Sequence, residues 1–376
     1  MRLVVAHHLF AQSGGGERLS AAVIDESIKR GVTTTIATIS RFDPHEVFAR
    51  FGLTFNGEVE EKYLIPFFLN AFGIYQKLFS SYPALLSCKR RPPDAIFIDN
   101  EFIEPLRPLQ GRSRIICYIH FPIFLELQMQ STRPEKYNRF PWNLYWKPWG
   151  SIASKLIPKQ NFADVVCCNS YFTKGYVDKL WNCDSIVIYP PVATSSFTVR
   201  EKMRIVCCLG RITPEKRYEI ALQAVSKTSG IRLEIIGGLA PAMRRYAESL
   251  QHLARQLEIH DRVTFRYNAP FSIIKSVLAR SAVFLHTMKN EHFGIAPVEG
   301  MASGCFPIVH KSGGVWHDIV EEGRYGLGFE EADEIPDLIE KAMELQPKFE
   351  ESLIERARRF DESVFRRKIF EIILDQ

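Results

Sequence analysis

Short apolar runs rich in β-branched residues alternate with segments of helical periodicity along almost the whole chain. This alternation restricts the fold more than any other feature of the sequence, because it predicts parallel sheets built from strand–helix–strand units. Strands are expected in the first half at residues 3–8, 33–39, 95–99, 114–120, 163–169 and 185–190. A second series is expected at residues 203–210, 231–238, 262–267, 282–286 and 306–310.

A chain of 376 residues is too long for one ordinary hydrophobic core. The Pro/Ser/Thr-rich stretch at 190–199 separates the two strand series and is typical of an interdomain linker. We therefore predict an N-terminal domain at 1–190 and a C-terminal domain at 198–358, with an amphipathic helix at 361–376 that packs back on the first. Two such α/β domains leave a cleft, and ligands of open α/β sheets bind beyond the carboxyl ends of the strands.

Composition excludes several classes of protein. Hydrophobic residues at 46% and charged residues at 24% are ordinary for a soluble globular protein. The net charge of +5 favours an anionic partner, such as a phosphate ester or an acidic membrane surface, and does not indicate nucleic acid. The uncharged stretch at 63–76 is too short and too polar to cross a bilayer, so it is expected to lie on one or in a core.

The eight cysteines include two adjacent pairs, Cys167–Cys168 and Cys207–Cys208, each in a predicted strand. Neighbouring strand residues point to opposite faces of a sheet, so these pairs are expected to fill the core rather than to form disulfides or bind metal. No CxxC spacing occurs, and a strand begins at residue 3, which leaves no room for a targeting segment. A reducing, cytoplasmic setting is the expectation.

Two glycine-containing turns follow strands where an anion could bind. Gly14, Gly15 and Gly16 open a helix predicted at 16–30, and glycines there let the backbone and the positive helix end approach a phosphate. Helix packing alone explains these glycines equally well, and the dinucleotide pattern GxGxxG is absent. In the second turn, Arg211 and Lys216 are two cations at a strand end, which suits a diphosphate better than a solvated basic turn.

The stretch Glu291 to Gly304 is the most informative part of the sequence. Glu291 falls in the loop after a strand, and Glu299 falls about two turns into a helix that begins near Gly294. The spacing lets both carboxylates face one cleft, and the helix start could bind a diphosphate. Apolar neighbours such as Phe293 favour a functional pair over a solvated surface helix.

The turn GRITPEK (210–216), followed about eighty residues later by EHFGIAPVE (291–299), resembles the family 4 retaining glycosyltransferases of GT-B fold, which have two Rossmann-like domains. The resemblance covers nearly the whole chain. Within that family, the segments SGGGERL, CYIHFP, ADVVCCNSYFTKGYVDKLW, IVIYPPV and NEHFGIAPVEGMASG resemble the lipid-linked oligosaccharide α-1,2-mannosyltransferases of N-glycan assembly and their archaeal relatives.

The resemblance implies a role for each candidate residue. Glu291 would bind hydroxyls of the transferred sugar, Glu299 the ribose, and Arg211 with Lys216 the diphosphate. His120, at the end of a strand, would lie at the reacting centre, although a core histidine is the commoner fate of such a residue. The implied donor-binding set is completed by Gly14, Gly15, Gly16, Gly237, His292, Phe293, Gly294 and Ile295. His7 and His8 are given only a structural role.

The implied reaction moves a hexose, with GDP-mannose as the favoured donor, to a polyprenyl- or dolichyl-linked saccharide. Same-face attack is expected, in which the leaving phosphate accepts the proton of the acceptor. No DxD triplet occurs, so neither a metal nor another cofactor is expected. Alternatives are a UDP-sugar transferase, an epimerase or phosphorylase of this fold, and a non-catalytic binding subunit; the intact set of acids and cations argues against the last.

Residues 133–159 carry six cations and one acid among several aromatic residues. This composition suits the interface of an anionic membrane. A core helix with a solvated edge explains this segment equally well by itself. Together with the stretch at 63–76 and a lipid-linked acceptor, it favours peripheral binding at the cytoplasmic face of a membrane. The sequence does not specify the oligomeric state.

Overall fold

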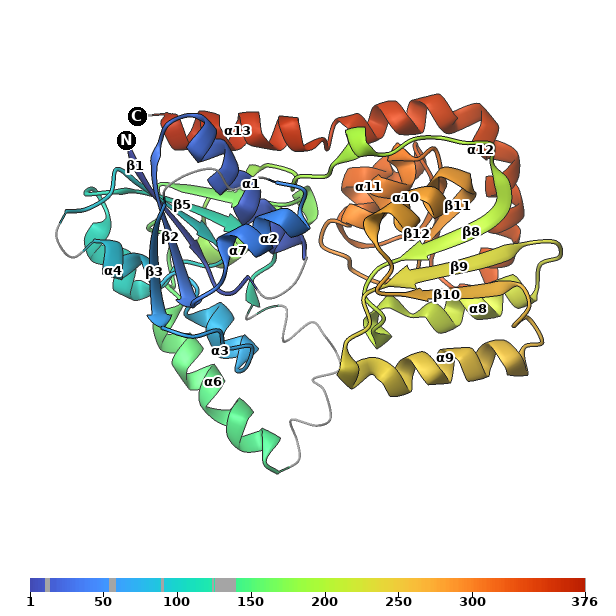
Figure 1. The fold of residues 1–376 in the computed structure, drawn as a ribbon, viewed down its shortest axis with the longest axis horizontal. Coiled ribbons are helices and arrows are strands. Elements are labelled where there is room, and N and C mark those ends of the chain that lie inside the picture. The colour runs from blue at the N-terminus through green and yellow to red at the C-terminus, as the bar shows by residue number, and fades with distance from the viewer. Residues whose placement is uncertain (11–13, 54–58, 89–90, 124, 126–139, 376) are drawn as a thin grey trace. The chain divides into compact units, whose positions relative to one another are not determined.

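The computed structural model describes residues 1–376 except 11–13, 54–58, 89–90, 124, 126–139 and 376. It divides into two compact units, one formed by Met1–Pro191 with Phe365–Gln376 and the other by Val192–Val364. Each unit contains one parallel sheet with helices packed around it (Figure 1). The α/β class predicted from the alternating pattern is confirmed.

The first sheet has seven strands among the described residues, in the order β3-β2-β1-β4-β5-β6-β7. The strands are β1 (Arg2–His7), β2 (Thr33–Ser40), β3 (Glu60–Ile65), β4 (Ala95–Asp99), β5 (Arg114–Ile119), β6 (Val165–Cys168) and β7 (Ile186–Val187). The helices of this part of the chain are α1 (Gly15–Lys29), α2 (Pro44–Arg50), α3 (Gly73–Leu78), α4 (Ala84–Ser87), α6 (Trp142–Leu156) and α7 (Tyr171–Trp181).

The second sheet has six strands among the residues described, in the order β10-β9-β8-β11-β12-β13. The strands are β8 (Met203–Leu209), β9 (Arg232–Gly237), β10 (Val263–Tyr267), β11 (Ser281–His286), β12 (Phe306–His310) and β13 (Leu327–Phe329). The helices are α8 (Tyr218–Ser226), α9 (Arg244–Gln256), α10 (Phe271–Arg280), α11 (Ile295–Ala302), α12 (Ile335–Arg358) and α13 (Glu362–Leu374), the last of which continues into the first unit.

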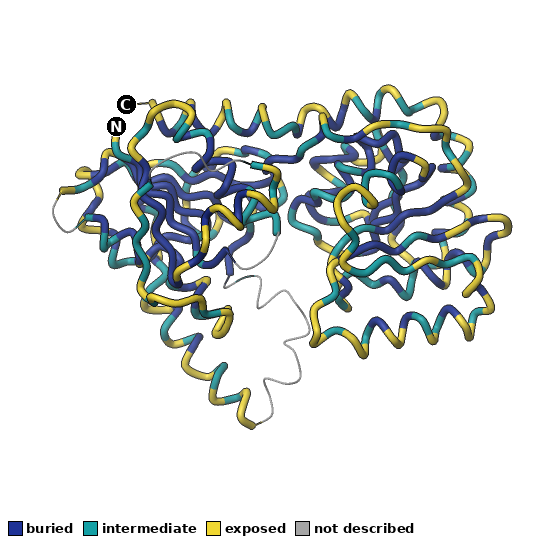
Figure 2. Tube along the Cα trace, viewed as in Figure 1, coloured by how far each residue is buried: buried dark blue, intermediate teal, exposed yellow. Residues whose placement is uncertain are grey.

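Both faces of the first sheet are buried, because side chains of alternate strand residues enter separate cores. Leu3 and Val5 belong to one core and Val4 to the other. Cys167 and Cys168 divide in the same way, and Cys207 and Cys208 are also buried. All eight cysteines are free thiols, and the burial of both adjacent pairs confirms that they fill the core. Figure 2 shows the central strands as the most buried parts of each unit.

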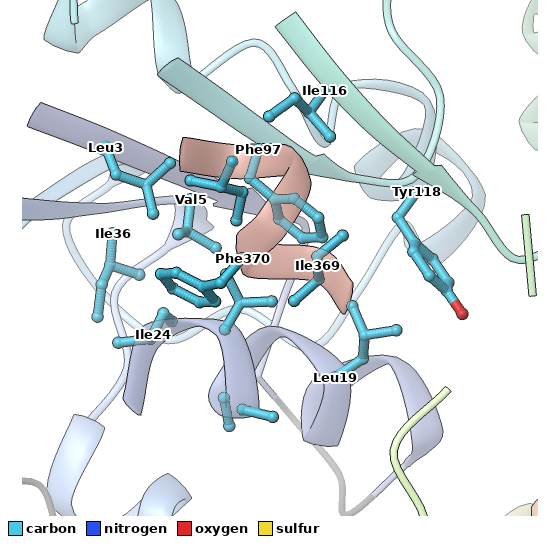
Figure 3. Packing of buried hydrophobic residues seen from close by; sticks show 14 of the residues in the cluster. Leu3, Val5, Leu19, Ile24, Ile36, Phe97, Ile116, Tyr118, Ile369 and Phe370 are labelled. Carbon is cyan, nitrogen blue, oxygen red and sulfur yellow. The ribbon is translucent and has the colours of Figure 1, made fainter. Parts of the chain in front are cut away.

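The end of the chain contributes to the core of the first unit. Side chains of α13, among them Ile369 and Phe370, lie against Leu3, Val5 and Ile24 (Figure 3). Each is at most 1% exposed. Burying a large apolar side chain stabilises a fold by about 1.5–3 kcal/mol, so this helix is an integral part of the unit.

Two strands, β3 and β13, were not predicted from the sequence. Both lie at sheet edges, where strands are short and need not be apolar on both faces. β3 has the sequence EEKYLI and is only partly buried, and β13 has three residues. The stretch at 63–76 therefore begins in a strand and ends in α3. In the described part of the chain, none of the helices combines the length and the apolar composition needed to cross a membrane.

The strand order determines where a ligand can bind in each sheet. Strand order reverses between β1 and β4 in the first sheet and between β8 and β11 in the second. At such a point the two crossover connections leave in opposite directions and open a crevice beyond the carboxyl ends of the strands. A ligand is therefore expected to bind at residues just after β1, β4, β8 and β11.

Candidate functional site

A buried carboxylate lies at the switch point of the first sheet. Asp99, the last residue of β4, is completely buried. Its Oδ2 lies 2.7 Å from His7 Nδ1 and accepts a hydrogen bond of 2.7 Å from Ser20 Oγ. Its Oδ1 lies 2.6 Å from Nε2 of His120, the residue after β5. Burial alone would raise the pKa of Asp99, but the charge and hydrogen bond of His120, together with His7, hold that pKa well below its usual range.

The glycine-rich helix start lies directly against this cluster. Gly14 is the N-cap of α1, and its backbone is extended. A Cβ atom on Gly16 would lie 3.4 Å from His120 Nε2 and 3.6 Å from Asp99 Oδ2. Gly15 and Gly16 form the first turn of α1, whose backbone N–H groups lack partners within the helix. Gly16 therefore brings a helix N-terminus beside His120.

A second cluster lies at the switch point of the other sheet. Lys216 Nζ donates a 2.5 Å hydrogen bond to Glu291 Oε2, and His286 Nε2 lies 3.3 Å from the same oxygen. The side chains of Lys216 and Glu291 are 15% and 17% exposed. Burial alone would raise the pKa of Glu291, but the charge of Lys216 and the contact with His286 hold that pKa well below its usual range. Burial lowers the pKa of His286.

Backbone contacts fix the turn that carries Lys216. Thr287 Oγ1 donates to the carbonyl oxygen of Lys216 at 2.5 Å, and Tyr218 donates to the carbonyl of Arg211 at 3.2 Å. Gly237, at the end of β9, has no room for a side chain, because a Cβ atom there would lie 1.7 Å from the carbonyl oxygen of Gly210. Gly237 thus supports the turn by close packing.

Arg211 lies at the tip of β8, as predicted, but its side chain is 70% exposed. Its Nη2 lies 3.5 Å from a carboxylate oxygen of Glu215. An exposed pair of this kind contributes little to stability, so the guanidinium can reorient toward an anion at small cost.

The Glu291 loop leads into α11. Gly294 is the N-cap of this helix with φ of 101°, a backbone conformation that disfavours side chains. The carbonyl of Glu291 accepts a 2.7 Å hydrogen bond from the backbone N–H of Gly314. Phe293 is buried, whereas His292, Ile295 and Glu299 are partly exposed. Glu299 is the fifth residue of α11, so it lies little more than one turn into the helix and not the two turns predicted from the sequence.

The structure brings Lys216 and Glu291 into one ion pair and places Gly16 beside His120. Asp99 and His286 were not predicted as site residues from the sequence, and His7 was given only a structural role. A usable signal was present, since both Asp99 and His286 are polar residues that close an otherwise apolar strand at a switch point. No group of three or more His, Cys, Asp or Glu side chains in the described ranges could hold a metal ion.

Comparison with known proteins gives matches over both units. Residues 194–360 match the family model "Glycosyl transferases group 1". Proteins named GDP-Man:Man(3)GlcNAc(2)-PP-Dol alpha-1,2-mannosyltransferase from Dictyostelium discoideum and Xenopus laevis are 25% and 29% identical, over 74% of this chain and 63% of their own length in each case. The Homo sapiens protein of that name is 30% identical over 65% of this chain and 55% of its own length. The chain thus spans less than two thirds of these relatives.

Solved structures resemble the chain over its full length. HepE from Anabaena, crystallised with UDP, aligns with a TM-score of 0.70 and 16% identity over 100% of both chains. Sucrose-phosphate synthase from Thermosynechococcus elongatus aligns with a TM-score of 0.71 and 15% identity over 100% of this chain and 98% of its own. These likenesses establish the GT-B fold that the sequence predicted.

Proposed function

We propose that this protein is a retaining glycosyltransferase that transfers mannose from GDP-mannose to a lipid-linked saccharide. The match of residues 194–360 to the family model "Glycosyl transferases group 1" supports the proposal. The observation that carries the proposal is the Lys216–Glu291 pair at the switch point of that domain, next to the glycine-capped start of α11. The name of the relatives, which specifies GDP-mannose and a dolichyl-diphosphate acceptor, supports this choice of substrates.

The proposed donor site uses the second unit. Lys216 and Arg211 bind the diphosphate, and backbone N–H groups at Phe293, Gly294 and Ile295 add to that anion site. Glu291 accepts hydrogen bonds from hydroxyls of the sugar, because an ionised carboxylate can only accept. Glu299 binds the ribose. The donor nucleotide sugar requires no metal in this proposal, since the cations are supplied by side chains.

The proposed chemistry breaks the bond between the anomeric carbon and the diphosphate oxygen, and a hydroxyl oxygen of the acceptor bonds to that carbon on the same face. The proton of this hydroxyl passes to the departing phosphate. Negative charge builds on the leaving diphosphate, where preorganised cations and helix N–H groups stabilise it most effectively. His120 acts beside the transferred sugar.

We assign the acceptor saccharide to a hollow of about 620 Å³ in the first unit. It lies beyond the carboxyl ends of β1 and β2, where Phe10, Arg41 and Phe42 line it together with Phe68. The rings of His7 and Phe10 are 4.6 Å apart, so the hollow adjoins the Asp99 cluster. The exposed ring of Phe68 beside carboxylates and guanidinium groups suits a saccharide, whose hydroxyls both donate and accept hydrogen bonds.

Peripheral membrane binding is the second part of the proposal. Residues 126–139 lie outside the described residues, so support comes from α3, α6 and their neighbours. Phe72, Trp142 and Leu144 are 59%, 45% and 59% exposed. The rings of Phe72 and Trp142 both lie about 6 Å from that of Tyr145, at 6.0 and 6.1 Å. Large exposed aromatic side chains with nearby lysines, such as the exposed Lys147, suit an anionic bilayer interface. The free cysteines suit the cytoplasmic face.

The decisive experiment for the activity incubates the purified chain with GDP- and UDP-sugars and polyprenyl-diphosphate oligosaccharides, with EDTA in one arm, followed by linkage analysis. Mannose in α-1,2 linkage from GDP-mannose, unaffected by EDTA, is the expected result. If sugar is transferred only from a UDP-sugar, the donor is that UDP-sugar and not GDP-mannose. Absence of transfer from every donor would refute the function.

For the membrane, sedimentation with anionic liposomes at low salt should be lost when Phe72 and Trp142 are both changed to serine. Phe271→Ser, at an exposed aromatic residue of the other unit, is the matched control and should sediment like the wild type. Equal sedimentation of the double variant would contradict this surface.

A further inference from the structure

The partners of Asp99 determine which neighbouring atoms carry protons. Asp99 faces three polar groups, His7 Nδ1, Ser20 Oγ and His120 Nε2, at 2.7, 2.7 and 2.6 Å. An ionised carboxylate only accepts hydrogen bonds, and a carboxylate with no exposure needs such partners to remain ionised. All three groups must therefore donate to it.

His7 is a cation in this arrangement. Its Nδ1 faces the carboxylate, and its Nε2 lies 3.2 Å from the carbonyl oxygen of Leu9, which also can only accept. Both ring nitrogens then carry a proton. Burial alone would lower the pKa of His7, but the hydrogen bond and charge of Asp99 outweigh it and raise that pKa. Burial and the charge of His7 lower the pKa of the neighbouring His8. The positive charge therefore lies on His7 and not on His8.

His120 reaches the other oxygen of the same carboxylate. Its Nε2 must donate to Asp99 Oδ1, and an imidazole with a single N–H then keeps the lone pair on Nδ1. Within the described part of the chain, Nδ1 has no hydrogen-bond partner, and the side chain is 29% exposed. Gly16 lies against the ring, since a Cβ atom there would be in van der Waals contact with Nε2 at 3.4 Å.

We propose that Asp99, together with His7, is a positioning residue that holds His120 in the tautomer with its proton on Nε2. Nδ1 is thereby presented as an acceptor for a hydroxyl group of the sugar substrate. This inference rests on the proposed function, which places His120 beside the transferred sugar. Asp99 and His7 do not touch the substrate and act through the orientation of one ring.

The test combines Asp99→Asn with NMR of the full chain. An asparagine has one acceptor oxygen and two N–H donors, so it cannot accept from all three partners. Long-range ¹H–¹⁵N spectra, with His120 assigned by the His120→Phe variant, report the protonated nitrogen. We expect Nε2–H in the wild type, loss of that single form in Asp99→Asn, and a fall in kcat of about 10²-fold, with the KM for GDP-mannose nearly unchanged.

Asp25→Asn is the matched control. Asp25 is also a buried carboxylate of the first unit, but its partners are Lys29 and Arg366. This variant should lose stability and keep both the tautomer and kcat. A proton on Nδ1 of His120 in the wild type would overturn the inference, and so would an Asp99→Asn variant with lower stability but unchanged tautomer and kcat. If no sugar is transferred by the wild type, the proposed function fails, whereas the wild-type spectrum still decides the tautomer.

Discussion

Replacement of Lys216 by alanine tests the proposed donor site most directly. The side chain of Lys216 is 15% exposed, and its ammonium pairs with Glu291 at 2.5 Å. Removal of a preorganised donor to developing charge typically costs about 10²–10³ in rate, or about 2.7–4 kcal/mol of transition-state stabilisation. We expect a fall of that size in kcat/KM for mannose transfer, measured with GDP-mannose as the limiting substrate.

The same change affects stability, because it leaves the Glu291 carboxylate without its cation. Breaking a fully buried pair costs about 3–5 kcal/mol, and the partial exposure of both groups reduces this to about 2–3 kcal/mol. For a unit of this size that corresponds to a fall in Tm of about 4–12 °C. Addition of Glu291→Gln to Lys216→Ala should restore most of the stability and none of the activity, which separates the two effects.

The pH dependence follows from the depressed pKa of Glu291. A carboxylate whose folded pKa lies below its unfolded value contributes stability above the unfolded pKa and loses it as the pH falls through the folded pKa. Without Lys216, burial raises the folded pKa of Glu291, so the loss of stability that the wild type shows as the pH falls should be smaller in the variant. Lys341→Ala, at an exposed lysine of α12, is the matched control. A folded Lys216→Ala variant with wild-type kcat/KM would refute the reasoning.

Three further predictions follow from steric and titration effects. Gly16→Ala should leave His120 in place, because its Cβ atom would make only ordinary van der Waals contact at 3.4 Å, and Tm should not fall, since alanine favours a helix; Gly175→Ala, in open space, is the matched control. Gly237→Ala should lower the free energy of unfolding by at least about 3 kcal/mol in urea titrations, whereas Gly238→Ala, with nothing near its Cβ, should not. Burial, with the charges of Lys289 and Arg217, lowers the pKa of His310 to about 4, so stability contributed by its neutral form should be present above about pH 6.5 and lost toward pH 4. His310→Gln should remove that part of the Tm profile, and an identical profile would contradict it.

Local patterns in the sequence were enough to predict the two parallel sheets and most of their strands. Buried parallel strands must be apolar on both faces, so they appear as continuous runs such as VVCC and SAVFLH. The edge strands β3 and β13 need not be apolar on both faces, so they were not predicted from the sequence. The positions of Arg211, Lys216, Glu291 and Gly294 at strand and helix ends were also readable, because such positions follow from spacing along the chain.

Partnerships between side chains were decided only by the tertiary structure. Lys216 and Glu291 are 75 residues apart, and His7 and Asp99 are 92 residues apart. They meet because the strand order places β8 beside β11 and β1 beside β4, an arrangement that hydrophobic periodicity does not encode. Whether a histidine at a strand end is a core residue or part of a charged cluster depends on what the neighbouring strand brings to it, which explains why His7 was assigned only a structural role from sequence.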